Sequence, residues 1–272
     1  MRLFVSFVSC TYIKMIIELI ICVALLFLIG VLFYKHRRDT IEIYQIEFTN
    51  ASTTLGELIG DKHPIVVRGC NFPQILTQAN LQQIPRLDAF PLHTDENSPT
   101  LSVYRMTPYR DSGMPLISPT SGRTLAGELA LDKWATHSLN DFSTELTGYL
   151  SSVMSTRVSV LLGGHGMKRS TAIYTCILVT EGKYTLSLLS KRSEEFLPKQ
   201  WWWLYPESLT INDTPLVNEV QFVDVVLRPG TMLVIPAQFI YSCKVDTGFH
   251  GAVIIEYDTP ISNLANLLEK FE

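Results

Sequence analysis

The stretch LRPGTMLVIPAQFIYSC, residues 227–243, decides how we expect the chain to fold. Pro229 and Gly230 predict a turn. The apolar run of residues 232–235 predicts a buried strand, and Pro236 predicts a break before a second strand. Two short apolar strands joined by such a break are typical of one edge of a β-barrel.

The same stretch resembles the C-terminal motif of cupin-like, JmjC-type oxygenases. In that family an apolar strand ends in isoleucine-proline, and two aromatic residues and a metal-binding histidine follow. Tyr241 stands at the place of this histidine. Residues 170–176, STAIYTC, resemble the family's histidine-x-acid segment, with Tyr174 at the place of the histidine and Cys176 at the place of the acid. The resemblance covers most of residues 40–258, and all three metal positions are altered.

The resemblance implies a mainly β fold, a double-stranded β-helix (cupin or jelly-roll-like) barrel with a few flanking helices. The apolar run described below predicts one transmembrane helix before it. The predicted division is an N-terminal extension (1–14), a transmembrane helix (15–34), a basic linker (35–40) and the barrel domain (41–272). Strands are predicted at residues 41–48, 63–69, 101–106, 158–162, 172–180, 184–189, 223–227, 231–235, 239–245 and 253–257, and helices at residues 53–59, 142–153 and 261–271.

Residues 15–34, MIIELIICVALLFLIGVLFY, carry Glu18 as their only charge. Their number matches the ~20 apolar residues that cross a hydrocarbon core. They predict a single-pass membrane protein with the lipid bilayer as a partner. A signal peptide is the competing interpretation, but the apolar run is too long and lacks a small-residue cleavage site before the basic residues 35–38. Met15 is a second candidate start, and either start keeps the anchor.

Positive charge predicts the orientation of the anchor. Lys35, Arg37 and Arg38 follow the apolar run, whereas Arg2 and Lys14 precede it. The large domain is therefore expected on the cytoplasmic side. An odd number of cysteines after the anchor agrees with this orientation. Two glycosylation sequons, which matter only in a secretory compartment, keep the opposite orientation open.

Composition limits the function classes. The chain has 272 residues, of which 47% are hydrophobic, and its formal net charge is −4. About 230 residues remain after the anchor, which suits one all-β domain. The chain is mildly acidic and shows no basic footprint, so we expect no nucleic-acid partner.

The altered metal positions argue against the family's chemistry. Non-haem iron oxygenases hold Fe(II) with two imidazoles and one carboxylate. A tyrosine has a reference pKa near 10 and is a poor ligand when neutral. We therefore expect Tyr174, Cys176 and Tyr241 to pack the barrel interior, with no catalytic residue, metal or cofactor. His165, predicted in a loop, and His250 each lie nine residues from these positions, too far along an extended strand to substitute as ligands.

Two residues are candidate contacts for a keto acid or another anion. Thr171 lies on the serine/threonine-rich lead, and Lys183 follows the glycine after the predicted strand. The family places its lysine one residue further on, so Lys183 is expected to face the other side of the strand.

The run Trp201-Trp202-Trp203 is the most unusual local composition. If it is extended, Trp201 and Trp203 share one side and Trp202 takes the other. One interpretation is packing across the barrel mouth. The other is an exposed patch that binds a protein partner or dips into a membrane interface.

The sequence thus predicts a membrane-anchored, catalytically inactive barrel that acts as a binding or scaffolding module. The alternative is a membrane-tethered Fe(II)/2-oxoglutarate-dependent protein hydroxylase that uses non-standard ligands. A third candidate is a metal-free small-molecule sensor, which a ligand would stabilise without turnover.

Overall fold

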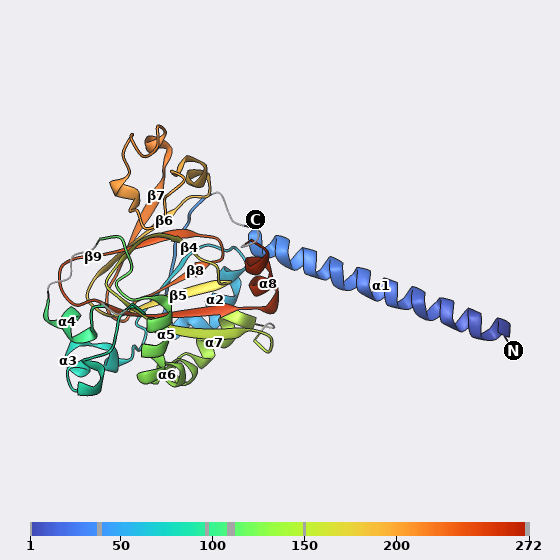
Figure 1. Cartoon of the computed structure of the whole chain (residues 1–272), viewed down its shortest axis with the longest axis horizontal. Helices are drawn as coiled ribbons and strands as arrows, with labels where there is room; N and C mark the ends of the chain where they lie inside the picture. The colour runs from blue at the N-terminus through green and yellow to red at the C-terminus, as the bar shows by residue number, and fades with distance from the viewer. Residues whose placement is uncertain (1, 37–39, 96–97, 108–111, 149–150, 270–272) are drawn as a thin grey trace.

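A long N-terminal helix stands off a β-rich domain in the computed structural model (Figure 1). The structure describes residues 2–36, 40–95, 98–107, 112–148 and 151–269. The helix, α1 (Arg2–Lys35), continues without interruption through the predicted N-terminal extension. Its segment Lys14–Lys35 contains an 18-residue stretch with a mean hydropathy of 3.1 and is long and apolar enough to cross a membrane, a property that signal sequences share.

Two facing sheets form the domain. The described ranges contain the strands β1 (Tyr44–Glu47), β2 (Ile65–Arg68), β3 (Ser155–Leu162), β4 (His165–Arg169), β5 (Tyr174–Glu181), β6 (Tyr184–Leu189), β7 (Phe222–Leu227), β8 (Met232–Pro236), β9 (Ile240–Val245) and β10 (Gly251–Asp258). The large sheet has the order β1-β2-β8-β5-β10-β3, and the small sheet has the order β4-β9-β6-β7. The fold is therefore mainly β, as the sequence predicts.

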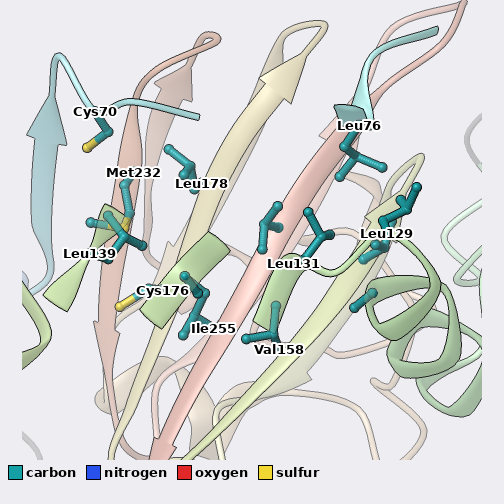
Figure 2. Close-up of a cluster of buried hydrophobic side chains, with 14 of the residues drawn as sticks. Cys70, Leu76, Leu129, Leu131, Leu139, Val158, Cys176, Leu178, Met232 and Ile255 are labelled. Carbon is teal, nitrogen blue, oxygen red and sulfur yellow. The ribbon is translucent and has the colours of Figure 1, made fainter. Parts of the chain in front are cut away.

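Helices cover the outer face of the large sheet. They are α2 (Ala51–Ile59), α3 (Gln78–Leu81), α4 (Leu101–Met106), α5 (Pro119–Glu128), α6 (Leu131–Ser138) and α7 (Asn140–Thr147). Leu131 of α6 lies in one core with Leu178, Ile255 and Val158 of the sheet, and Leu129 and Leu139, which directly follow α5 and α6, belong to the same core (Figure 2). A Cβ at Gly122 of α5 would lie 2.7 Å from the carbonyl oxygen of Val160, so this glycine permits close helix–sheet packing.

A second core lies between the two sheets. Ile177, Leu233 and Ile254 of the large sheet meet Leu186 and Tyr241 of the small sheet there. Because both faces of the large sheet are covered, its central strands are nearly continuous apolar runs rather than alternating ones. This explains why β5 and β8 are recognisable in the sequence without a period of two.

Several predicted elements differ from the structure. Residues 101–106 form α4 rather than a strand, because Leu101 and Tyr104 are buried at helical spacing. Helix α7 ends at Gly148, where φ is +49°, so Val153 lies beyond it and is exposed. Two other residues of that predicted helix face, Tyr149 and Leu150, lie outside the described residues. The sequence missed α5 and α6, whose polar outer faces weaken their apolar pattern.

Helix α1 is docked on the domain by its last turns. The Tyr34 hydroxyl lies 2.5 Å from the Thr171 carbonyl oxygen and 2.7 Å from Asn266 Oδ1, and its one proton is shared between these two acceptors. Asn266 belongs to α8 (Pro260–Glu269), which lies beside the base of α1 in Figure 1. Lys62 Nζ donates to the carbonyl oxygens of Phe33 and His36 and caps the C-terminal end of the helix.

Candidate functional site

The three altered metal positions do not come together. On β5, Ile177 and Val179 belong to the core between the sheets. Side chains two residues apart share a face, so Tyr174 and Cys176 point to the opposite side, where they join the helix-covered core. Tyr241 of β9 points between the sheets. The expectation that all three fill the barrel interior holds for Tyr241 only.

Strand β4, rather than β5, faces Tyr241. Lys168 pairs with Tyr241 across the strands, and His165 pairs with Cys243. Directly paired residues of an antiparallel ladder lie on the same face, so both side chains point into the barrel interior. The Lys168 amine lies 5.2 Å from the centre of the Tyr241 ring. The His165 ring packs edge-on against the Tyr241 ring at 5.5 Å.

His165 is therefore a buried strand residue, and its predicted place in a loop is wrong. It is 1% exposed, and its Nδ1 lies 2.7 Å from the Gly166 carbonyl oxygen. Its Nε2 has no partner among the described residues. Burial, reinforced by the charge of Lys168, holds the pKa of His165 well below its usual range, so the imidazole is neutral at pH 7.

Burial also shifts the pKa values of Tyr241 and Lys168 in the direction that favours their neutral forms. It raises the pKa of Tyr241 well above its usual value, so the phenol stays protonated. Burial lowers the pKa of Lys168, partly offset by the charges of neighbouring acidic groups. The pair of strands β4 and β9 thus brings together the neutral imidazole of His165, the neutral phenol of Tyr241 and the partly desolvated amine of Lys168.

The tryptophan run closes this end of the interior. The amide of Trp203 donates to the Met167 carbonyl oxygen at 3.1 Å, and the Met167 amide donates to the Leu204 carbonyl oxygen at 2.7 Å. The run thus lines the free edge of β4. A Cβ at Gly166 or at Gly113 would overlap the Trp203 carbonyl, so both glycines are required by this close approach.

The run is a turn and not a strand, so the predicted alternation of faces is wrong. Trp203 has φ of +68°, and its ring meets the ring of His165 edge-on at 6.4 Å. Trp201 is buried on the outer face of the small sheet beside Met167, Leu189 and Ile240. Trp202 is 49% exposed and stacks on Trp201 with ring centres 3.9 Å apart. The run therefore divides into packing residues and one exposed ring.

The two candidate anion contacts lie apart. Thr171 precedes β5 and Lys183 follows it, so the eight-residue strand separates them by roughly 25 Å at ~3.3 Å per residue. Both side chains are exposed. The carbonyl oxygen of Thr171 accepts hydrogen bonds from Tyr34 and Asn266, which assigns it to the docking of α1. These two residues do not form one site.

The residues of the interior do not fit an Fe(II) and 2-oxoglutarate centre. That chemistry needs two imidazoles and a carboxylate on one face. The side chains around Tyr241 supply one imidazole, one thiol and an amine that would repel a cation. Among the described residues no group of three or more His, Cys, Asp or Glu side chains is placed to hold a metal ion.

Sequence reasoning missed Lys168 and misplaced His165 for one structural reason. The β4–β9 ladder shifts register between His165 and Lys168. Residues three apart on a regular strand face opposite sides, and only this irregularity brings both inward. The signal that was available is the pair of glycines at 163–164, which marks a change of direction before a new strand.

Comparisons with known proteins return structural likeness alone. No family model and no curated protein matches the chain. The structure is similar to SnoN, a non-haem α-ketoglutarate-dependent epimerase of nogalamycin biosynthesis, with 11% identity and a TM-score of 0.43 over 78% of this chain and 87% of that chain. It is also similar to a cupin superfamily protein of Desulfitobacterium hafniense, with 14% identity and a TM-score of 0.23 over 38% of this chain and 67% of that one.

A third similar structure is Drosophila melanogaster CENP-C bound to CAL1. It has 15% identity and a TM-score of 0.24 over 37% of this chain and 64% of that chain. All three TM-scores are below 0.5, so the description of the fold rests on strand order and burial.

Proposed function

We propose that the chain is a membrane-anchored binding module built on a double-stranded β-helix barrel without iron chemistry. The strand order supports the barrel. From β3 to β10 the chain passes back and forth between the two sheets, leaving two strands in succession in one sheet only at β6–β7. Eight strands wound in this way across two sheets are typical of jelly rolls, including cupins.

The observation that carries the proposal is the pairing of Lys168 with Tyr241 inside the barrel. A cation over the Tyr241 ring occupies the neighbourhood in which the resemblance expects a metal. Apolar residues, Leu186 and Ile177 among them, fill the rest of this core. The backbone of Trp203 packs against Gly166 at the edge of the same strand. This interior serves as a packed platform, and binding is assigned to the outside of the domain.

The lobe between β6 and β7, residues 190–221, carries the proposed partner surface. It covers the outer face of the small sheet and extends from it beside β7 (Figure 1). Trp202, Ile211 and Leu216 are exposed on this lobe. Tryptophan is enriched at protein–protein interfaces and often dominates their binding energy. The partner is therefore a protein with an apolar contact site.

Metal analysis tests the absence of iron chemistry. The full chain is purified in detergent, and Fe(II) binding is measured with and without 2-oxoglutarate. We expect no stoichiometric iron and no turnover of the keto acid. Iron that is retained by the wild type and lost in His165→Ala would overturn the proposal and support the hydroxylase alternative. Thermal stabilisation by 2-oxoglutarate without iron would support the sensor alternative instead.

Partner recovery tests the lobe. Proteins crosslinked to the full chain in its native membrane are compared for Trp202→Ala and for Met106→Ala, a control at another exposed apolar residue outside the lobe. We expect Trp202→Ala to lose the partner and Met106→Ala to keep it. Equal recovery with both variants would contradict the proposed surface. Trp201→Ala is no substitute, because Trp201 packs on the small sheet.

The proposal places the domain on the cytoplasmic side. Asn212 lies in a sequon and is exposed. The test is the electrophoretic mass of the full chain before and after glycosidase treatment. We expect no change, and a shift that disappears in Asn212→Gln would reverse the orientation.

A further inference from the structure

An apolar groove lies where α1 meets the barrel domain. Its volume is about 910 Å³, within the roughly 300–1,000 Å³ that is usual for ligand sites. One wall is α1 itself, through Leu26, Ile29 and Phe33. The opposite wall is the domain, with Ile59 of α2, Val153 and Ile173 among its residues.

The groove lies beside the segment of α1 that is long and apolar enough to span a bilayer. The α1 wall belongs to Lys14–Lys35, the segment that is apolar and long enough to span a bilayer. A groove walled by such a helix is continuous with the hydrocarbon region that the helix enters. Val153 on the domain wall, and Leu264 and Leu267 on the adjacent α8, are exposed apolar residues. This side of the domain therefore presents apolar surface beside the membrane-spanning segment.

The groove is held open by fixed contacts rather than by the ligand. The hydrogen bonds of Tyr34 and Lys62 anchor α1 on the domain. The Lys62 amine also lies 3.7 Å from the centre of the Phe33 ring. At Gly30 a Cβ would lie 2.9 Å from Ile261 Cδ1, so the helix and α8 are in tight contact beside the groove.

Polar groups are few and gather on the domain side. Lys62, Glu145 and Tyr174 line the groove among mostly apolar neighbours. Burial lowers the pKa of Lys62 to about 8, so its amine is still mainly protonated at pH 7. Burial raises the pKa of Tyr174 to about 12, so its phenol is neutral. A long apolar chain with a polar end fits this lining better than a polar metabolite does.

We propose that the groove takes an acyl chain of a bilayer phospholipid, which makes the junction of α1 and the domain a lipid-binding site. The proposal rests on the membrane anchor of the proposed function. The lipid enters sideways from the bilayer, because the α1 wall is the part of the groove that the bilayer surrounds. The chain packs between Ile29 and Phe33 on one side and Ile173 on the other.

Photolabelling tests the proposal. The full chain is reconstituted in phosphatidylcholine vesicles that contain a phosphatidylcholine with a diazirine in its acyl chain, and labelled residues are mapped by mass spectrometry after irradiation. We expect label on the domain wall, at Ile59, Val153 or Ile173, in addition to α1. Label that is restricted to α1 would overturn the proposal.

A variant in which a large side chain fills the groove tests whether the label on the domain wall depends on the groove. A Cβ at Gly56, in α2, would meet only Glu145 Oε2 at 3.8 Å, so Gly56→Phe places a ring in the groove without a clash at its base. We expect label on the domain wall to fall about tenfold, since the ring displaces several methylene contacts. Gly127→Phe is the control, because Gly127 lies in α5 with open space around it. Equal labelling of the domain wall in the two variants would overturn the proposal.

Other occupants give different results. If a diazirine fatty acid added without vesicles labels the domain wall more strongly than the phospholipid does, the ligand is a soluble lipid and the proposal fails. Crosslinks from the domain wall to a second copy of α1 would also overturn it. Flotation of the vesicles distinguishes failure of the membrane anchor from failure of the lipid-binding groove. A chain that does not float with the vesicles refutes the anchor. A chain that floats but carries no label on the domain wall refutes only the groove.

Discussion

The two faces of the large sheet are both buried, but they are built differently. The outer face meets helices through leucine, valine and isoleucine, with Cys176 as a polarisable residue among them. The inner face meets a small sheet that brings His165 and Lys168 toward Tyr241. Apolar packing is shared by the two faces, and the inner side adds an imidazole and an amine from β4.

This difference affects how well each face can be predicted from the sequence. The outer face needs only volume and shape, so sequence patterns predict it well. The inner side also holds polar groups beside Tyr241: His165, which is 1% exposed, and Lys168, which is partly exposed. The donor set of this interior, one imidazole, one thiol and one amine, does not fit an iron centre.

The largest expected effect tests whether the inner face is a packed core. Ile177 and Leu178 are neighbours on β5, both fully buried and on opposite faces. Ile177→Ala and Leu178→Ala should each lower the free energy of unfolding by about 2–5 kcal/mol, because each removes buried methyl groups and leaves a cavity. Chemical denaturation measures both. A much smaller loss for Ile177→Ala would mean that the interior is a solvated chamber.

The next effect tests the closure of the barrel by the tryptophan run. Gly166→Ala introduces a Cβ that overlaps the Trp203 backbone. We expect a loss of about 1–3 kcal/mol through displacement of the turn, together with a change in tryptophan fluorescence. Gly127→Ala is the control, since open space surrounds it in a helix and alanine is favoured there. Unchanged fluorescence in Gly166→Ala would remove Trp203 from the closure.

Substitutions of Cys176 test whether this thiol only packs in the outer core or is required as a polar group or ligand. Its pKa is raised far above the usual range by burial, so the thiol is protonated. Cys176→Ser should lower the free energy of unfolding by about 1–3 kcal/mol, because a hydroxyl enters an apolar core. Cys176→Ala should cost less, about 1 kcal/mol. Thermal denaturation of the two variants measures this order, and the reverse order would mean that a polar group at this position is required.

The smallest expected effect concerns pH. In the folded state the pKa of His165 lies well below its usual value, whereas in the unfolded chain it is about 6.5. Below that pH the unfolded state binds the extra proton, so stability is full above pH 6.5 and falls on acidification by at most about 1.4 kcal/mol per pH unit. Denaturation of wild type and His165→Gln between pH 5 and 7.5 measures the difference. Parallel curves would show that His165 does not titrate between the two states.

Much of the fold is predictable from the sequence, because burial on both faces leaves apolar runs that turn residues delimit. The strands β6, β8 and β10 illustrate this, each within two residues of its predicted bounds at either end. The helix over residues 53–59 is likewise found, two residues longer at its start. The helices α3 to α6 and the strand β4 were not predicted as such, since their short or irregular apolar patterns resemble strands or loops.

The site was less predictable, because it depends on which face of a strand each residue takes. A one-residue difference in register moves a side chain from one core to the other. The resemblance placed Tyr174 and Cys176 correctly on a strand and predicted that they face the barrel interior, whereas the structure has them on the outer face. His165 and Lys168 reach the interior through an irregular ladder, which no periodic pattern encodes.

The docking of α1 also restricts how the barrel domain can move relative to the helix. The last turns of the helix are hydrogen-bonded to Thr171, Asn266 and Lys62, so we expect the helix and the domain to rotate together as one rigid body. In the membrane-anchored arrangement that we propose, rotation of the chain about the axis of α1 would therefore carry the Trp202 lobe around the helix at a fixed height above the bilayer. The proposed partner, if it lies in the same membrane, would then have to present its contact site at the height of that lobe.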